Sequence, residues 1–338
     1  MTLPSHPSSD TRRFAPTHRR AWLKGFAASA LLSPIARLSH ASGNTVDLDW
    51  QDTGRDRSVP VRLYLPERRS AERALAPLVV FSHGLGGSRY GYSWLGSYFA
   101  ANGIASLHVQ HIGSDRAVWS ERGNPLAMLG RLQQAASERE ALARVQDLRF
   151  AIDKLADSSF SATIDTRRIV AAGHSYGANT ALLASGARVD RPGLDTRVSD
   201  PRITSVVLIS APPFHGEGSA EKILARLSLP SLHITATEDT IRLPGYYSTV
   251  DDRVALFDAT PGPDKTLVVF AGGSHSMFTD RTSPGGETVN LAVKAATREL
   301  VLGFVERTVL GTPMRLHGWR DRHATLLARF VEAGQHPA

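Results

Sequence analysis

The chain has no cysteine, so disulfide bonds, thiol nucleophiles and cysteine metal ligands are all excluded. Aromatic residues are also few, at 7% of the 338 residues, and there are only 4 methionines. The most apolar stretch, residues 25–35, is about half as long as the roughly 20 residues of a membrane-spanning helix. A chain of this composition, 42% hydrophobic and without repeats, must draw its stability from a large core.

The positive charge of the chain is concentrated at its N-terminus. The net charge is +7, but residues 1–41 hold six Lys and Arg and one acid, which leaves 33 bases against 31 acids, or +2, in the remainder. The high sequence pI of about 10.0 is therefore poor evidence for nucleic-acid binding, and no basic stripe interleaved with aromatics is present. We predict no nucleic-acid partner.

The N-terminal segment has the layout of an export signal. A basic stretch ending in Arg19, Arg20 and Lys24 precedes the short apolar stretch, and Ser39 and Ala41 supply small residues where a signal peptidase reads them. The paired arginines resemble a twin-arginine signal. We predict that residues 1–41 are a cleaved signal peptide of this type. The protein would then be periplasmic or secreted, folded before translocation, and without a stable membrane anchor.

Residues 173–177 read GHSYG and fit the pattern G-x-S-x-G. Residues 168–172 before them, RIVAA, predict a short buried strand, and residues 178–184 after them predict the first turns of a helix. A serine on a tight turn between strand and helix projects its hydroxyl from the C-terminal edge of the sheet, and glycines there let the helix pack closely. We predict Ser175 as a nucleophile.

A second glycine-rich turn, SHGLGG at residues 82–87, follows the apolar run 77–81. Such a turn lets a substrate carbonyl approach backbone N–H groups closely. We predict an oxyanion hole made by the N–H of Leu85 and the N–H of Tyr176, the residue after the nucleophile.

A serine hydroxyl needs a base to take its proton, and three histidines follow Ser175 before the last helical segments. His233 lies inside an apolar strand pattern and is predicted to pack there, while His215 lies in a loop without other signals. His275 follows the apolar run 266–270 in a glycine-bearing loop, from which a base can reach over to the nucleophile. We predict His275 as the base.

The acid that orients the histidine should follow the preceding strand, and two adjacent carboxylates, Glu238 and Asp239, lie there. Asp239 is predicted for this role because it lies deeper in the loop and its shorter side chain holds an imidazole more rigidly. Glu238 remains the alternative, since the pattern permits either acid.

These segments, with residues 55–66 and 108–115, resemble the α/β-hydrolases over nearly all of residues 45–310. Within that fold the chain looks like the bacterial esterases described as dienelactone-hydrolase-like or platelet-activating-factor-acetylhydrolase-like. Dienelactone hydrolases use a cysteine nucleophile, whereas this chain has Ser175, which favours ordinary esters. The resemblance implies a serine esterase that acts on short- to medium-chain acyl esters through an acyl-enzyme. The alternatives are another acyl hydrolase with the same triad (a lipid acetylhydrolase, lactonase, amidase or polyesterase) or a non-catalytic binding protein.

The rest of the pattern predicts an α/β fold, a mostly parallel sheet with helices on both faces. Expected strands are 61–65, 78–81, 105–109, 169–172, 205–209, 231–235 and 266–270, and the clearest expected helix covers about 136–156. We predict one catalytic domain, 42–338, with a helical C-terminal extension. The loops 112–135, 212–224 and 240–263 carry apolar and aromatic residues that either wall a substrate pocket or cover the sheet edges.

No cofactor and no metal are predicted. His108 and His111 are three apart on a strand end and so face opposite sides, which makes them a poor chelating pair. Asp115 is predicted to be structural rather than catalytic. The expected partner is a small-molecule or lipid-like ester substrate, and the sequence leaves the oligomeric state open.

Overall fold

The computed structural model describes residues 44–67, 74–119, 125–189, 198–243, 245–280, 287–313 and 316–333. The expected signal peptide, residues 1–41, lies outside these ranges and stays a prediction. Within them, no helix is both long enough and apolar enough to cross a membrane.

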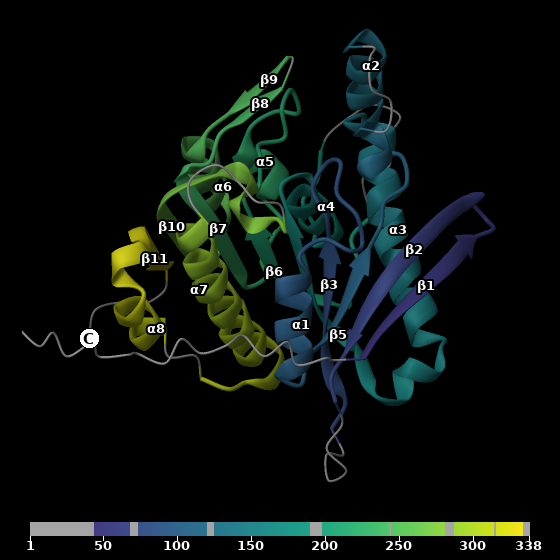
Figure 1. Cartoon of the computed structure of the whole chain (residues 1–338), viewed down its shortest axis with the longest axis horizontal. Helices are drawn as coiled ribbons and strands as arrows, with labels where there is room; N and C mark the ends of the chain where they lie inside the picture. The colour runs from purple at the N-terminus through teal and green to yellow at the C-terminus, as the bar shows by residue number, and fades with distance from the viewer. Residues whose placement is uncertain are drawn as a thin grey trace, which may run out of the picture. The chain divides into compact units, whose positions relative to one another are not determined.

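One large sheet organises the described residues (Figure 1), with the strand order β1-β2-β4-β3-β5-β6-β7-β10-β11. The six strands from β4 to β10 in this order run parallel, while β1, β2 and β11 are antiparallel to their neighbours. The strands are β1 Asn44–Asp52, β2 Arg57–Leu65, β3 Ala76–Ser82, β4 Ala105–Val109, β5 Ile164–His174, β6 Ile203–Ile209, β7 Ser231–Glu238, β10 Lys265–Ser274 and β11 Leu327–Ala333. All seven expected strands are confirmed.

Helices cover both faces of this sheet (Figure 1), as the sequence predicted. One face packs against α3 Glu138–Ala156, α4 Tyr176–Ala184 and α5 Ala220–Leu224, and the other packs against α1 Ser93–Ala101, α7 Glu287–Val305 and α8 Leu316–Arg322. α6 Val250–Ala259 packs beside β7 and β10. The fold is an α/β-hydrolase fold.

The central strands read as continuous apolar runs because they are buried on both faces. In β3, Leu78 and Val80 pack into one core cluster, while Val79 and Phe81 pack into the cluster on the opposite face. Successive side chains of a strand point to opposite faces, so only a strand covered on both sides needs apolar residues at every position.

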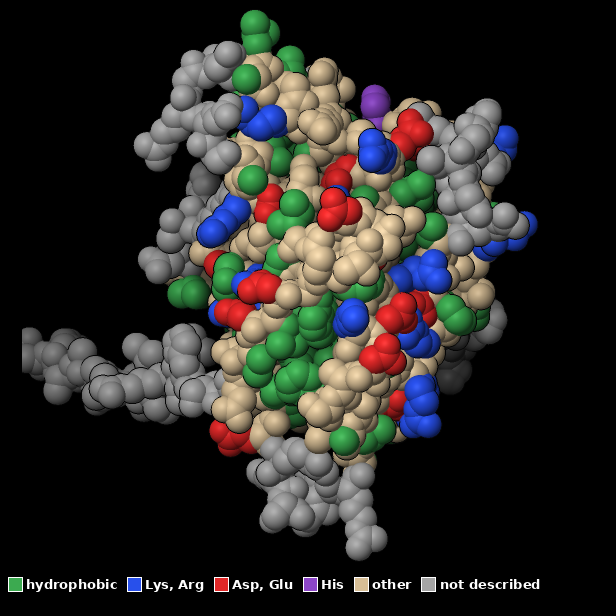
Figure 2. Space-filling view, turned by 90° about the vertical axis from the view of Figure 1, so that its right-hand side faces the viewer, with side chains coloured by type: hydrophobic (Ala, Val, Ile, Leu, Met, Phe, Trp, Pro, Cys, Tyr) green, Lys and Arg blue, Asp and Glu red, His purple; other side chains and the backbone are tan. Residues whose placement is uncertain are grey.

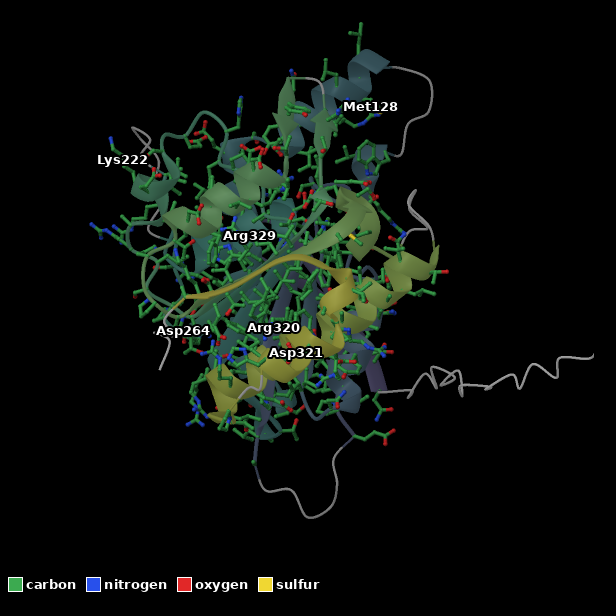
Figure 3. All side chains as sticks on the ribbon, turned by 90° about the vertical axis from the view of Figure 1, so that its left-hand side faces the viewer. Met128, Lys222, Asp264, Arg320, Asp321 and Arg329 are labelled. Atoms are coloured by element: carbon green, nitrogen blue, oxygen red, sulfur yellow. The ribbon has the colours of Figure 1, made fainter. Side chains whose placement is uncertain are left out.

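The C-terminal part of the chain differs from the expected helical extension. α8 is helical, but it is followed by β11, which pairs with β10 and forms an edge of the sheet. Figure 3 shows this edge, with Arg329 labelled on β11 and Arg320 and Asp321 on α8. The side chains of β11 are all exposed or half-buried, so its apolar pattern is too weak to have predicted a strand.

Two of the expected loops contain regular structure. Residues 112–135 include α2 Pro125–Ala135, and residues 240–263 include α6 and the small hairpin of β8 Ile241–Leu243 and β9 Tyr246–Ser248. α2 and this hairpin both stand beyond the C-terminal edge of the sheet (Figure 1). In Figure 3, Met128 marks α2 on the opposite side of the view from α8.

Parallel strands place their C-terminal ends at one edge of the sheet, where α/β folds bind ligands. Ser82 at the end of β3 pairs with Gly173 near the end of β5, and Ser274 at the end of β10 pairs with Glu238 at the end of β7. The segments that follow these strands are the ones from which the sequence predicted a site. On the face that Figure 2 shows, side chains of both charges surround an apolar strip that lies away from this edge.

Candidate active site

Ser175 occupies a sharp turn between β5 and α4. Its backbone has φ 55° and ψ −126°, a conformation that residues with a Cβ rarely adopt and that costs about 1–3 kcal/mol. The turn is held by hydrogen bonds on both sides: the Ser175 N–H donates to the Ile209 carbonyl at 2.9 Å, and the Ala178 N–H donates to the Ser175 carbonyl at 2.8 Å. The surrounding structure thus maintains a strained serine at the end of a central strand.

The two glycines of the motif are required by close backbone contacts. A Cβ on Gly177 would lie 1.9 Å from the Ser82 carbonyl oxygen, and a Cβ on Gly173 would lie 2.2 Å from the Gly177 carbonyl oxygen. Neither backbone atom can move without displacing a strand or the helix. Gly173 and Gly177 therefore let α4 start directly against β3 and β5.

Ser175, His275 and Asp239 lie within hydrogen-bond distance of one another in that order. His275 Nε2 is 2.8 Å from Ser175 Oγ, and His275 Nδ1 is 2.7 Å from Asp239 Oδ1. A carboxylate can only accept, so His275 carries its proton on Nδ1 and leaves Nε2 free to accept from the serine hydroxyl. The three residues follow three different strands. Along the chain, His275 is 36 residues from Asp239 and 100 residues from Ser175.

Asp239 is completely buried and fully paired. Its Oδ2 accepts a hydrogen bond from Thr235 Oγ1 at 2.7 Å, and Oδ1 lies 3.3 Å from Arg253 Nη2. Burial alone raises the pKa of the Asp239 carboxyl, but the hydrogen bond from His275 and the charges of His275 and Arg253 outweigh it and hold that pKa well below its usual range. Asp239 is therefore ionised at neutral pH and can fix the orientation of His275.

Arg253 is a residue that sequence reasoning missed. It is buried on α6, and its Nη1 donates to Ser248 Oγ at 2.7 Å and to the Thr249 carbonyl at 2.6 Å. A single arginine in an amphipathic helix gives no sequence signal of its own, so only the fold reveals that it faces Asp239.

Glu238, the alternative acid, has a different environment. Its side chain is exposed at the end of β7 and makes no hydrogen bond or ion pair with any described residue. The geometry therefore brings Asp239, and not Glu238, to His275.

His174, the residue before Ser175, holds the backbone of His275. Its Nε2 lies 2.9 Å from the His275 carbonyl oxygen, and its Nδ1 lies 2.8 Å from the Tyr92 hydroxyl. Since a carbonyl only accepts, Nε2 carries the proton and Nδ1 accepts from Tyr92. Burial and the nearby charge of His275 lower the pKa of His174 to about 3, so the ring stays neutral. No sequence pattern singles out either His174 or Tyr92.

The predicted oxyanion donors, Leu85 and Tyr176, both lie beside Ser175. The turn after β3 reaches the elbow so closely that a Cβ on Gly84 would be 3.2 Å from the Ser175 Cβ. Neither backbone N–H makes a hydrogen bond within the described ranges, and both residues line the same cavity as Ser175. Two unpaired donors beside a serine hydroxyl are suited to bind an oxygen that becomes negative during a reaction.

A fully buried cation, Arg144 on α3, ties these two turns together. Its Nη2 donates to the His83 carbonyl in the first turn, and its Nε donates to Thr180 Oγ1 on α4 at 2.9 Å. The guanidinium also lies over the Tyr176 ring, 4.5 Å from its centroid. Burial lowers the pKa of Arg144 to about 10, which still leaves it charged at neutral pH.

His108 and His111, the two histidines considered as metal ligands, make hydrogen bonds to different partners. His108 contacts Ser106 Oγ at 2.9 Å and the Gly91 carbonyl at 3.1 Å. His111 lies between Ser82 Oγ, at 3.1 Å from Nε2, and Asp147 Oδ2, at 3.2 Å from Nδ1. This serine–histidine–aspartate series resembles the first one, but all three side chains are fully buried, so Ser82 cannot reach a substrate.

Ser175 opens into a cavity of about 480 Å³, a size typical of small-molecule sites. Its walls come from α2, α3, α4, the residues after β6 and the β8–β9 hairpin, and most of them are apolar. They include Leu129, Leu132, Leu142, Leu183, Phe214, Leu243 and Tyr246. The expected loops thus contribute to a pocket wall. Of the aromatic residues in the expected loop 240–263, Tyr246 lines the cavity, Phe257 packs in the core and Tyr247 is exposed.

Comparison with known proteins adds one finding. Residues 67–121 match the family model described as platelet-activating factor acetylhydrolase, isoform II. The matched segment includes Leu85, but Ser175, Asp239 and His275 lie outside it. No curated protein matches the chain. Together with the fold, the match supports an acyl hydrolase of the esterase type: the chain has an α/β-hydrolase fold and resembles the platelet-activating factor acetylhydrolases.

Proposed function

We propose that the protein is a serine hydrolase of carboxylic esters with short to medium acyl chains. The observation that carries this proposal is the position of Ser175 Oγ, 2.8 Å from His275 Nε2 on a strained turn that opens into an apolar cavity. The family match supports the ester bond as the target.

In the proposed reaction His275 takes the proton of Ser175 as Oγ attacks the ester carbonyl. The N–H groups of Leu85 and Tyr176 stabilise the oxyanion, and Asp239 stabilises the imidazolium. His275 then gives the proton to the leaving alcohol. Water attacks the acyl-enzyme by the same steps and releases the acid. No metal or organic cofactor takes part in this scheme.

Two observations argue for catalysis rather than binding alone. A binding protein has no use for the strain at Ser175, which costs stability, or for a buried, ionised Asp239 placed to orient His275. A lactone or an amide could be attacked by the same groups, and the match to an acetylhydrolase family favours the ester.

Among nitrophenyl acetate, butyrate, octanoate and palmitate, we expect the highest kcat/KM for acetate or butyrate. The matched family model describes an acetylhydrolase, an enzyme that removes a two-carbon acyl group, so short acyl chains are the expected substrates. Initial rates give kcat/KM for each ester, after subtraction of the rate with the Ser175→Ala variant as background. A maximum at palmitate with activation at an oil–water interface would instead make the enzyme a lipase.

We also propose that the protein is exported through residues 1–41 and that residues 42–338 form its one catalytic domain. The basis is the sequence pattern around Arg19 and Arg20. Replacing both by lysine is expected to leave the full-length precursor inside the cell, because twin-arginine receptors read the pair. Fractionation and immunoblotting would measure this, with Arg12→Lys and Arg13→Lys as the matched control. Unchanged export of the Arg19 and Arg20 variant would contradict the proposal.

A further inference from the structure

Asn179 lies on α4 four residues after Ser175, one turn further along the helix. Helical side chains lean toward the N-terminus of their helix, so the Asn179 amide lies over the turn that carries the nucleophile. The residue is 7% exposed and lines the same cavity as Ser175.

The side-chain oxygen of Asn179 is buried without a hydrogen-bond partner. This Oδ1 atom is shut off from solvent and has no hydrogen bond to any described residue. Buried polar atoms in native structures are almost always paired, because an unpaired one loses its hydration without compensation. An exception that faces a cavity next to a nucleophile points to a group on the ligand.

The other polar side chains that α4 gives to the cavity are already occupied. Thr180 Oγ1 accepts from Arg144 and donates to the Tyr176 carbonyl at 3.1 Å, and the Tyr176 hydroxyl donates to the Ser137 carbonyl at 3.5 Å. Asn179 is thus the polar side chain of this helix that remains for recognition.

The cavity lies on the acyl side of the ester. His275 must protonate the leaving alcohol, so that alcohol sits next to His275 Nε2 during the reaction. Ser175, Leu85 and Tyr176 line the cavity, whereas His275 does not. An acyl group bound through the Leu85 and Tyr176 N–H groups therefore extends into the cavity and past Asn179.

We propose that Asn179 binds a hydroxyl group on the acyl chain, so that the preferred substrates are esters of hydroxy acids. This inference rests on the proposed ester hydrolysis. A hydroxyl both donates and accepts, so it satisfies the amide whichever way its oxygen and nitrogen are placed. A plain alkyl chain leaves the amide oxygen unpaired in the complex, and sites with a buried polar group discriminate against ligands that lack its partner.

The test compares nitrophenyl esters of hexanoate, 3-hydroxyhexanoate and 6-hydroxyhexanoate with the purified protein. At least one hydroxy ester is expected to have a kcat/KM about tenfold above hexanoate, the effect of one hydrogen bond that is otherwise left unmade. Leucine has a volume similar to that of asparagine. Asn179→Leu is expected to raise kcat/KM for hexanoate and lower it for the hydroxy ester, so that the ratio of hydroxy ester to hexanoate falls below one.

Two control variants separate polarity from shape. Gln146→Leu, the same kind of change at an exposed position of α3, should keep the wild-type ratio and rates. Leu129→Ala enlarges the cavity and should change the rates of the hexanoate and hydroxy esters together.

Thermal unfolding gives a second readout. Asn179→Leu should raise Tm by about 3 °C, because it removes an unpaired buried amide oxygen, whereas a structural hydrogen bond at Asn179 would make Tm fall. Three results would each overturn the inference. The first is a wild-type kcat/KM for both hydroxy esters that is close to that for hexanoate. The others are a ratio of these values that Asn179→Leu does not change, and a fall in Tm. If the wild type still hydrolyses hexanoate and Ser175→Ala does not, the proposed ester hydrolysis stands without the inference about hydroxy acids. No hydrolysis of any ester overturns both proposals.

Discussion

Replacing Ser175 by alanine is expected to lower kcat for ester hydrolysis by about five orders of magnitude. Alanine removes the atom that forms the acyl-enzyme, the Oγ that lies 2.8 Å from His275 Nε2. His275→Ala should cost about as much, because the serine proton then has no acceptor. The double variant should be little worse than either single one, since the three groups act as a unit.

The controls for this expectation are folding and labelling. Alanine tolerates the backbone of residue 175 as well as serine does, so circular dichroism and Tm of Ser175→Ala should match the wild type. A fluorophosphonate probe should label the wild type once, and mass spectrometry should place the adduct on Ser175. Near-normal turnover by Ser175→Ala, or an adduct on another residue, would refute the assignment of the nucleophile.

Asp239→Asn is expected to lower kcat by about 10⁴-fold, because an amide no longer enforces the productive tautomer of His275 or stabilises its cation. The effect is large because Asp239 is fully buried and is paired with Thr235 and Arg253, so no water can replace it. Kinetics with one short-chain ester measure it.

Glu238→Gln is the matched control, an adjacent carboxylate changed to an amide. Its exposed side chain makes no hydrogen bond or ion pair with a described residue, so kcat should stay within about twofold of the wild type. If Glu238→Gln proved the more damaging of the two, the role of the acid would pass to Glu238.

The sequence predicted those parts of the molecule that local patterns determine. Strands such as β3 and β6 are buried on both faces and are recognisable as apolar runs, and the order of serine, acid and histidine along the chain could be read from the turns that follow them. The edge strand β11 was missed because half-buried strands have weak patterns.

The residues that support the site could not be predicted in the same way. Arg144, Arg253, His174 and Tyr92 act through contacts with residues 14 to 101 positions away, such as Arg253 with Asp239 and His174 with His275. No local pattern encodes a contact of that range. The unpaired amide oxygen of Asn179 was equally hidden, since its significance is the absence of a partner in the folded chain.

The pairing of β11 with β10 bears on how the protein behaves at high concentration. β10 is a long strand whose buried residues Leu267, Val268 and Phe270 would otherwise end the sheet with free backbone N–H and carbonyl groups. Such an edge is a template for adding strands from other molecules. β11 occupies it with a strand that carries the exposed Arg329, and a charged edge resists further pairing (Figure 3). By occupying the edge of β10, β11 is expected to lower the tendency of the protein to aggregate through that strand.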